Sequence, residues 1–215
     1  MSTQQCSRIG WTMSSALALV LVTAFVTQRV VSQEYGKKEG GPPQMSKADQ
    51  EMMAKMQEMG SPGPNHKHLA HFVGNWKVET KFWMDPRGEA QSSTGTARTK
   101  WVLDGRFLME EVEGTAGGQP FKGIGMTGYD NFKKKYVSTW ADSMTTAIMM
   151  QLGTADSAAK TYTYTGDMDD CMTGKKKTVR SVCKVISESK HTFEMFDTGP
   201  DGKEFKNLEL VYTRM

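Results

Sequence analysis

Cysteine is scarce in this sequence, with three residues among 215, and this scarcity excludes a small domain built on a disulfide framework. Beyond Cys6, only Cys171 and Cys183 remain. A hairpin turn near Thr173-Gly174 would place Cys183 opposite Tyr164, and Cα atoms more than about 7 Å apart cannot be bridged. We therefore expect two free thiols, with a Cys171–Cys183 disulfide as the alternative.

A long hydrophobic run is also missing. The apolar stretch 16–26 is too short for a membrane-spanning helix, which needs about 20 residues. Arg8 precedes this stretch, and Gln28-Arg29 and then Val30-Val31-Ser32 follow it. The small-residue ending fits a signal peptide over residues 1–32. We expect cleavage near Ser32 and export to the periplasm or the extracellular space, with no stable membrane span afterwards. An uncleaved N-terminal anchor is the alternative.

A strong charge of one sign is absent as well. The formal net charge is +3 and the isoelectric point is about 8.6, which is too mild to indicate nucleic-acid binding. Two lysine triplets, at 133–135 and 175–177, both follow turn residues. Solvated hairpin tips explain them without a partner, and we expect no nucleic acid to bind.

Long amphipathic helices are missing too, and the sequence predicts one short helix. Residues 33–65 are rich in Gly, Pro, Lys and Glu, which is typical of a flexible tether. Within it, residues 46–59 start with a capping serine and end before Gly60-Ser61-Pro62, which terminates a helix. A second short turn or helix is expected at residues 68–72.

What the sequence does contain, from His66 onward, is short runs of alternating apolar and polar residues separated by turn signals. The predicted strands are 76–82, 93–103, 106–114, 121–129, 136–142, 146–153, 161–166, 177–186, 191–197 and 205–214. About ten strands at this spacing indicate antiparallel neighbours. Because consecutive hairpins close a sheet without leaving edges, we predict an all-β, antiparallel up-and-down barrel over residues 66–215.

The start of the first strand carries a resemblance. A short turn followed by Gly74-x-Trp76 resembles the N-terminal motif of lipocalins and related barrels. The resemblance implies that the tryptophan plugs the closed end and that a basic residue of the last strand packs across its ring. Arg214 is in phase with the apolar residues of the last strand, where a lone charge is costly unless it is stacked or paired. We therefore expect Trp76 and Arg214 to form the barrel base.

Most of the chain after His66 is similar to a bacterial family of exported proteins known as domain of unknown function 1579. The similar segments are GPNHKHLAHFVGNWKVETKFWMDP, TKWVLDGRFLMEE, FKGIGMTGYDNFKKKYVSTWADSM and HTFEMFDTGPDGKEF. The resemblance implies a lipocalin-like or fatty-acid-binding-protein-like barrel with no established activity. The sequence departs from the family at Asp170-Cys171-Met172, where proline is expected, and this puts a family-wide role for Cys171 in doubt.

A barrel of this size either fills its interior with side chains or encloses a small ligand. We predict an exported binding protein for a small apolar or amphipathic molecule, with no cofactor and no catalytic residues. An inward Arg106–Asp142 pair could orient a polar head group, and aromatic residues could line the wall. The predicted ligand-binding residues are Trp101, Arg106, Tyr129, Trp140, Asp142 and Tyr212.

Two other functions stay open at this stage. Thioether and imidazole groups bind copper, so the N-terminal segment could form a metal site or an interaction module through Met53, Met56, Met59, His66, His68 and His71. A haem enzyme is the remaining alternative, with a single histidine as ligand. His191 is the only histidine beyond the N-terminal segment, and its place just after a turn predicts solvent exposure.

Overall fold

A computed structural model describes residues 45–170, 173–199 and 201–215. The predicted signal peptide, the first part of the predicted tether and Cys171 lie outside these residues. The predicted N-terminal helix is confirmed as α1, Lys47–Gly60, and the Ser46 hydroxyl caps it by accepting a hydrogen bond from the Asp49 amide. A one-turn helix, α2 (Pro64–Lys67), and a 3-10 helix, η1 (His68–Phe72), follow.

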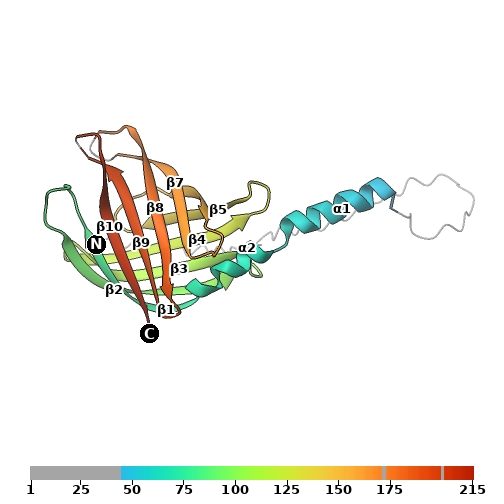
Figure 1. The fold of residues 1–215 in the computed structure, drawn as a ribbon, viewed down its shortest axis with the longest axis horizontal. Coiled ribbons are helices and arrows are strands. Elements are labelled where there is room, and N and C mark those ends of the chain that lie inside the picture. Colours follow the sequence, from blue (N-terminus) through green and yellow to red (C-terminus); the bar gives the residue numbers. More distant parts are fainter. Residues whose placement is uncertain (1–44, 171–172, 200) are drawn as a thin grey trace, which may run out of the picture. The chain divides into compact units, whose positions relative to one another are not determined.

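Ten antiparallel strands make up the rest of the described chain (Figure 1). They are β1 (Gly74–Phe82), β2 (Gln91–Val102), β3 (Phe107–Ala116), β4 (Gln119–Asp130), β5 (Lys135–Asp142), β6 (Met149–Ala155), β7 (Thr161–Asp169), β8 (Lys176–Ser187), β9 (Lys190–Thr198) and β10 (Glu204–Arg214). Each strand pairs with its neighbours in sequence, and β10 pairs with β1, so that the sheet closes on itself. The predicted all-β, up-and-down barrel is confirmed.

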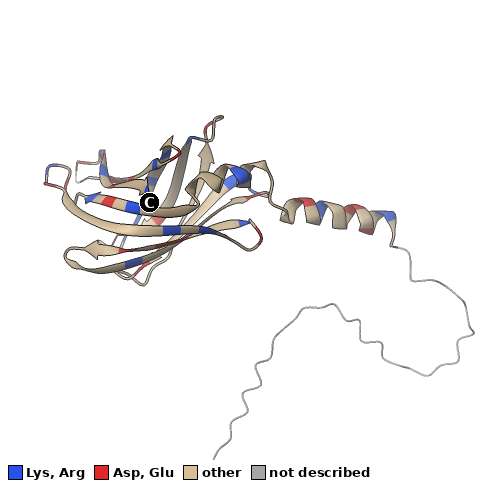
Figure 2. Cartoon of the chain, turned by 90° about the horizontal axis from the view of Figure 1, so that it is seen from below, with Lys and Arg blue, Asp and Glu red and all other residues tan. Residues whose placement is uncertain are grey.

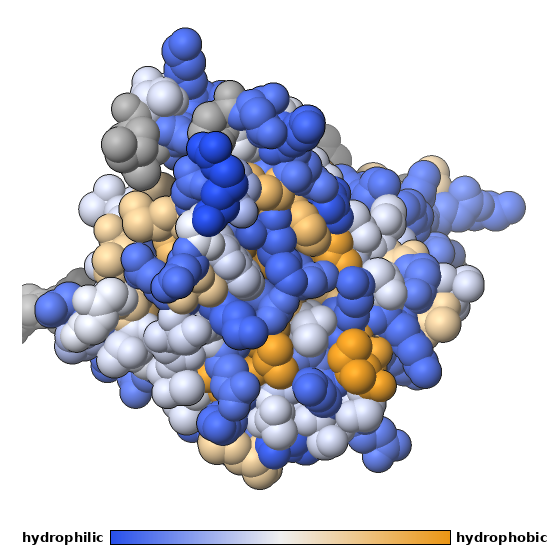
Figure 3. Space-filling view, turned by 60° about the vertical axis from the view of Figure 1, so that its left-hand side comes forward, coloured by the Kyte–Doolittle hydropathy of each residue, from blue (hydrophilic) through white to orange (hydrophobic). Residues whose placement is uncertain are grey.

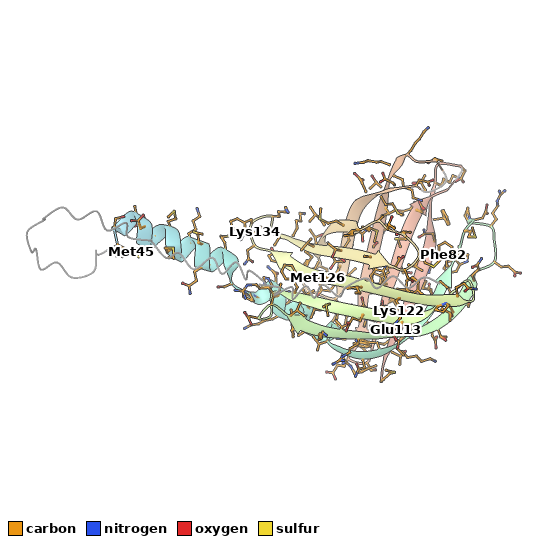
Figure 4. All side chains as sticks on the ribbon, turned by 180° about the vertical axis from the view of Figure 1, so that it is seen from behind. Met45, Phe82, Glu113, Lys122, Met126 and Lys134 are labelled. Atoms are coloured by element: carbon orange, nitrogen blue, oxygen red, sulfur yellow. The ribbon has the colours of Figure 1, made fainter. Side chains whose placement is uncertain are left out.

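The pairing register gives the barrel two distinct ends. At the end that we call the floor, Trp76 pairs with Arg214 and Gly74 pairs with Thr99. At the opposite end, which we call the mouth, Phe82 pairs with Leu208 and with Gln91. Figure 4 shows Phe82 and Lys134 at opposite ends of the barrel, with Lys134 in the floor-side turn between β4 and β5.

One turn differs from the sequence prediction. The sequence suggested a tight turn at Asp104-Gly105 that leads directly into a strand at Arg106. Instead Leu103, Asp104 and Gly105 all have positive φ angles, of 49°, 54° and 80°, and β3 begins only at Phe107. Non-glycine residues with positive φ are uncommon, so alternation alone gave no sign of this longer turn. Arg106 therefore belongs to the turn rather than to the wall.

Ion pairs cover part of the outer surface of the barrel. On β8, β9 and β10, the Glu194 carboxylate forms ion pairs with the ammonium groups of Lys184 and Lys206, each at 3.1 Å. The Arg180 guanidinium lies 2.6 Å from the Glu204 carboxylate. Glu113 and Lys122 form a similar pair on β3 and β4, at 2.9 Å, and are labelled in Figure 4. Charges of both signs follow one another along the strands (Figure 2). Exposed pairs of this kind contribute about 0–1 kcal/mol each.

Hydrophilic side chains dominate the face that Figure 3 shows, with smaller apolar groups between them. No helix within the described residues is both long enough and apolar enough to span a membrane. Two clusters of buried apolar residues form most of the core. The first contains Leu69, Leu108, Tyr136, Tyr162 and Tyr164. The second contains Trp76, Val78, Ala97 and Tyr212. This divided core determines the shape of the interior.

Candidate functional site

Trp76 seals the floor of the barrel. Its side chain is fully buried, and the indole Nε1 donates a hydrogen bond to the Phe72 carbonyl at 2.9 Å. The guanidinium carbon of Arg214 lies 4.2 Å from the centre of the indole ring. The same guanidinium donates to the carbonyls of Val73, His71 and Glu188, at 2.9–3.0 Å. Arg214 therefore joins η1, the β8–β9 turn and the last strand beneath the tryptophan.

His191 lies directly above this floor, and its predicted solvent exposure is wrong. The turn ends at Ser189, β9 begins at Lys190, and the His191 ring points inward with an exposed fraction of 5%. It stacks on Tyr212, with the ring centres 4.2 Å apart and the planes at 16°, and it meets Trp76 edge-on at 4.4 Å. Burial, with smaller contributions from His71 and Arg214, lowers the pKa of His191 to about 3. Nδ1 has no hydrogen-bond partner.

The inward-facing residues between the floor and the mouth are not all buried. Side chains alternate along each strand, and directly paired residues share a face, so the pairing register, followed from buried residues such as Trp76, gives the inward face of each strand. Several inward-facing residues outside the fully buried set keep partial exposure, and Val112, Phe193 and Leu210 among them pack against the second cluster. They include Thr80, Glu110, Val112, Thr127, Ser138, Trp140, Phe193, Met195 and Leu210. We call the space that they surround the lumen. A barrel widens as strands are added beyond eight, which is consistent with the partial exposure of these residues.

Two large aromatic rings cover glycines of a neighbouring strand. The Trp140 ring covers Gly123 and Gly125 on the neighbouring strand, since a Cβ atom built on Gly123 would lie 2.3 Å from Trp140 Cζ2. The Trp140 Nε1 donates to Asp142 Oδ2 at 2.9 Å, which fixes the indole in this position. The Tyr164 ring covers Gly153 on β6 in the same way, at 2.5 Å. Glycine on one strand thus makes room for an aromatic ring on the next.

Glu110 is an acidic group inside the barrel that the sequence analysis missed. It lies on β3 between Leu108 and Val112 and pairs with Thr99 on β2 and with Gly125 on β4. The Tyr212 hydroxyl is its hydrogen-bond partner. Burial raises the pKa of the Glu110 carboxyl to about 7, and the Tyr212 hydrogen bond partly opposes this shift. The available signal was its phase with two apolar neighbours, but Glu111 and Glu113 gave the segment the appearance of a solvated strand.

Cys183 also faces the interior, on β8, where it pairs with Tyr162 and Phe193. It is a free cysteine, in agreement with the expected free thiol at this position. Burial raises the pKa of its thiol above the ordinary value of 9.0, and the nearby Glu110 adds to the shift. The thiol is therefore neutral at ordinary pH. The Gln151–Ser181 pair, buried with two hydrogen bonds of 3.0 and 3.1 Å, is a further polar feature of this wall.

Charged groups at the mouth are paired with one another or with backbone groups. Lys177 on β8 contacts Asp197 at 2.5 Å and Asp170 at 3.2 Å. Asp142, at the end of β5, accepts hydrogen bonds from Trp140 Nε1 and from the Met144 amide, each at 2.9 Å. Among the described residues, the Glu110 carboxyl group forms neither an ion pair nor a hydrogen bond with a backbone group.

The six predicted ligand-binding residues occupy four different regions. Trp140 and Asp142 lie at the mouth side of the inner wall, and Tyr212 faces Glu110. Trp101 and Tyr129 face inward but pack against the buried cluster near the floor. Arg106 lies outside the barrel at the floor end, in a recess of about 210 Å³, and donates to the Gly60 and Leu103 carbonyls. The suggested Arg106–Asp142 pair does not form, because the two residues belong to opposite ends.

The methionines and histidines of the alternative metal site are separated by their contacts. Met53 and Met56 are exposed on α1. His66 Nδ1 accepts from the Gly63 amide, His68 Nδ1 lies 3.3 Å from the Tyr136 hydroxyl, and His71 packs against Trp76. Met59 lies beside His66 in the recess that contains Arg106. Within the described residues, no three His, Cys, Asp or Glu side chains gather as metal ligands.

Comparison with known proteins identifies the family. The model of a family described as "Protein of unknown function (DUF1579)" matches residues 61–214, which include every strand. The chain belongs to the DUF1579 family. No curated protein sequence matches this DUF1579 chain. A solved structure described as a redesigned β-barrel has 18% sequence identity, and the match covers 73% of this chain and 99% of that one at a TM-score of 0.35.

Proposed function

We propose that this DUF1579 barrel binds a small apolar or amphipathic molecule in its lumen. The observation that carries the proposal is the partial exposure of inward-facing residues such as Val112, Phe193 and Leu210, which pack against the buried cluster around Trp76. A closed floor and a lined opening are the arrangement by which small barrels hold one ligand. Apolar groups of the wall would contact the body of the molecule, and polar groups would fix its orientation.

Two features of the wall support this role. Trp140 and Tyr164 lie against glycines of neighbouring strands, so these two rings take positions that side chains of the neighbouring strands would otherwise occupy. The floor is fixed by hydrogen bonds and by ring stacking around Trp76, so a ligand need not order it on binding. A preformed site binds more tightly because less conformational freedom is lost.

Export is part of the proposal, since residues 1–32 have the pattern of a signal peptide. An exported barrel would carry or sequester its ligand outside the cytoplasm. The mass of the protein recovered from its host tests this point. A chain that starts near Gln33 is the expected result, and a chain of full length outside the cytoplasm would contradict cleavage.

Binding is tested by titrating the full chain with N-phenyl-1-naphthylamine, a neutral apolar dye whose fluorescence rises in apolar surroundings. We expect a saturable rise with one dye per chain. Ser138→Phe on β5 would fill the lumen and weaken binding about tenfold or more. Thr139→Phe, one residue along the same strand but on the outer face, is the matched control and should bind the dye as the parent does. Equal affinity of both variants, or an absence of saturable binding, would contradict the proposal.

A further inference from the structure

We propose that the lumen selects amphipathic molecules with a protonated amine as head group, and that Glu110 is the counter-ion of this amine. The inference rests on the proposed function and names the ligand class. Glu110 differs from the other inward-facing charged groups in its partners. Lys177 has two carboxylate partners, Arg214 has three carbonyl acceptors, and Asp142 has two donors. Glu110 takes part in none of the ion pairs among the described residues.

Within the part of the chain that the structure describes, no cationic side chain pairs with Glu110. Thr99 on β2 and Gly125 on β4 are its cross-strand neighbours. The titratable groups that face it are the Tyr212 phenol on β10 and the Cys183 thiol on β8. Both of these groups stay neutral, because burial raises the pKa of each well above its ordinary value. A carboxylate has room for about four hydrogen bonds, and Tyr212 supplies one donor.

The partial exposure of Glu110 is what leaves its carboxyl group accessible to a head group. Its β4 neighbour, Gly125, has no side chain of its own, and the Trp140 ring covers that position from the mouth side of the wall. Glu110 itself keeps partial exposure although it lies deep in the barrel. A primary ammonium group carries three donors and is compact, so it fits the missing partners of the carboxylate. Charge-assisted bonds of this kind are about twice as strong as neutral ones.

The charge of the inner wall has the sign that such a ligand requires. Between floor and mouth the inward-facing charged residues are Glu110, Asp142, Asp197 and Lys177, which are three acids and one base. Arg214 is excluded because it lies beneath Trp76 and is held by backbone carbonyls. The lumen is thus negative in a chain whose formal net charge is +3. A cationic head group is attracted into it and a carboxylate is repelled.

The test compares three molecules with the same alkyl chain, dodecylamine, dodecanol and dodecanoate, as competitors of N-phenyl-1-naphthylamine on the full chain at about pH 8. We expect the amine to compete about tenfold or more better than the alcohol, and dodecanoate to compete worst. Glu110→Gln should reduce the advantage of the amine to about twofold or less and leave the alcohol unchanged. Glu111→Gln, the outward-facing neighbour that pairs with Lys100, is the matched control and should keep the preference.

The outcomes separate this inference from the proposed function. If all three molecules compete equally, or if dodecanoate competes best, the amine preference is overturned while binding in the lumen stands. If the dye itself does not bind, the proposed function fails together with the inference. A second readout does not depend on the variant: amine affinity should rise between about pH 6 and pH 8, as Glu110 ionises and the amine stays protonated. A flat profile over this range overturns the counter-ion role.

Discussion

Arg214 on β10 packs against Trp76 on β1, where these two strands pair to close the barrel, and its guanidinium carbon lies 4.2 Å from the centre of the indole ring. We predict that Arg214→Leu lowers the free energy of unfolding by about 1–2 kcal/mol, because the stacking and three hydrogen bonds to carbonyls are lost. Arg214→Lys should recover only part of this loss, because an ammonium lacks the planar fork. Urea unfolding measures both variants, and equal stability of leucine and arginine would contradict the role of the pair.

Lowering the pH should destabilise the floor through His191. In the unfolded chain this imidazole binds a proton below about pH 6.5, whereas burial keeps it neutral in the folded barrel down to about pH 3. The free energy of unfolding therefore falls as the pH drops from 6.5 towards 3, by about 2 kcal/mol at pH 5 from this residue. Thermal unfolding between pH 5 and pH 8 measures the effect. Glu110 changes stability in the opposite direction over this range, so the effect of His191 is the difference between the parent and His191→Phe. The parent should lose about 2 kcal/mol more than the variant between pH 8 and pH 5.

Glu110 should have the opposite effect on stability. Its folded-state pKa of about 7 lies above the ordinary value of 4.5, so the folded barrel holds a proton that the unfolded chain releases. The contribution of Glu110 to stability is therefore fully present below pH 4.5 and is lost as the pH rises through 7. Glu110→Gln should raise the free energy of unfolding by about 2–3 kcal/mol at pH 8 and change it little at pH 4. The same gain in Glu111→Gln would show that the effect is not specific to the interior.

Gly123 should tolerate no larger residue, because the Trp140 ring occupies the space of its missing side chain. A Cβ atom there would lie 2.3 Å from Trp140 Cζ2, so Gly123→Ala should push the indole into the lumen. We expect a loss of about 1–3 kcal/mol in unfolding free energy and weaker dye binding. The control is Gly60→Ala, which meets no atom within 4 Å. Normal dye affinity in Gly123→Ala would mean that the Trp140 ring does not border the lumen.

The sequence predicted the barrel because its signals are local. Alternation identified all ten strands, and the turn residues between them predicted antiparallel neighbours. The phase of Arg214 and Trp76 was also readable, since both follow the apolar residues of their own strands. Alternation does not show which end of the barrel a residue occupies when strand boundaries shift. For this reason the sequence suggested a pair between Arg106 and Asp142, although the β2–β3 turn and the end of β5 lie at opposite ends of the barrel.

Glu110 and His191 were harder to interpret: Glu110 was not singled out, and His191 was expected to be exposed because it follows a turn. Both are in phase with apolar neighbours, Leu108 and Val112 for Glu110, and Phe193 and Met195 for His191. In the closed barrel this phase places both side chains inside. The division of the core into two clusters was inaccessible from sequence, because it depends on which rings lie flat over which glycines.

The pairing of β1 with β10 has a consequence for how this protein is made. The contact between Trp76 and Arg214 joins residues that are almost the whole domain apart in the chain. The barrel therefore cannot close until the last strand has left the ribosome. Until then β1 and the newest strand each present an unpaired edge, and such edges aggregate readily. Contacts of this sequence separation also slow folding. A nascent chain of this kind would benefit from a chaperone that covers its unpaired strand edges until β10 pairs with β1.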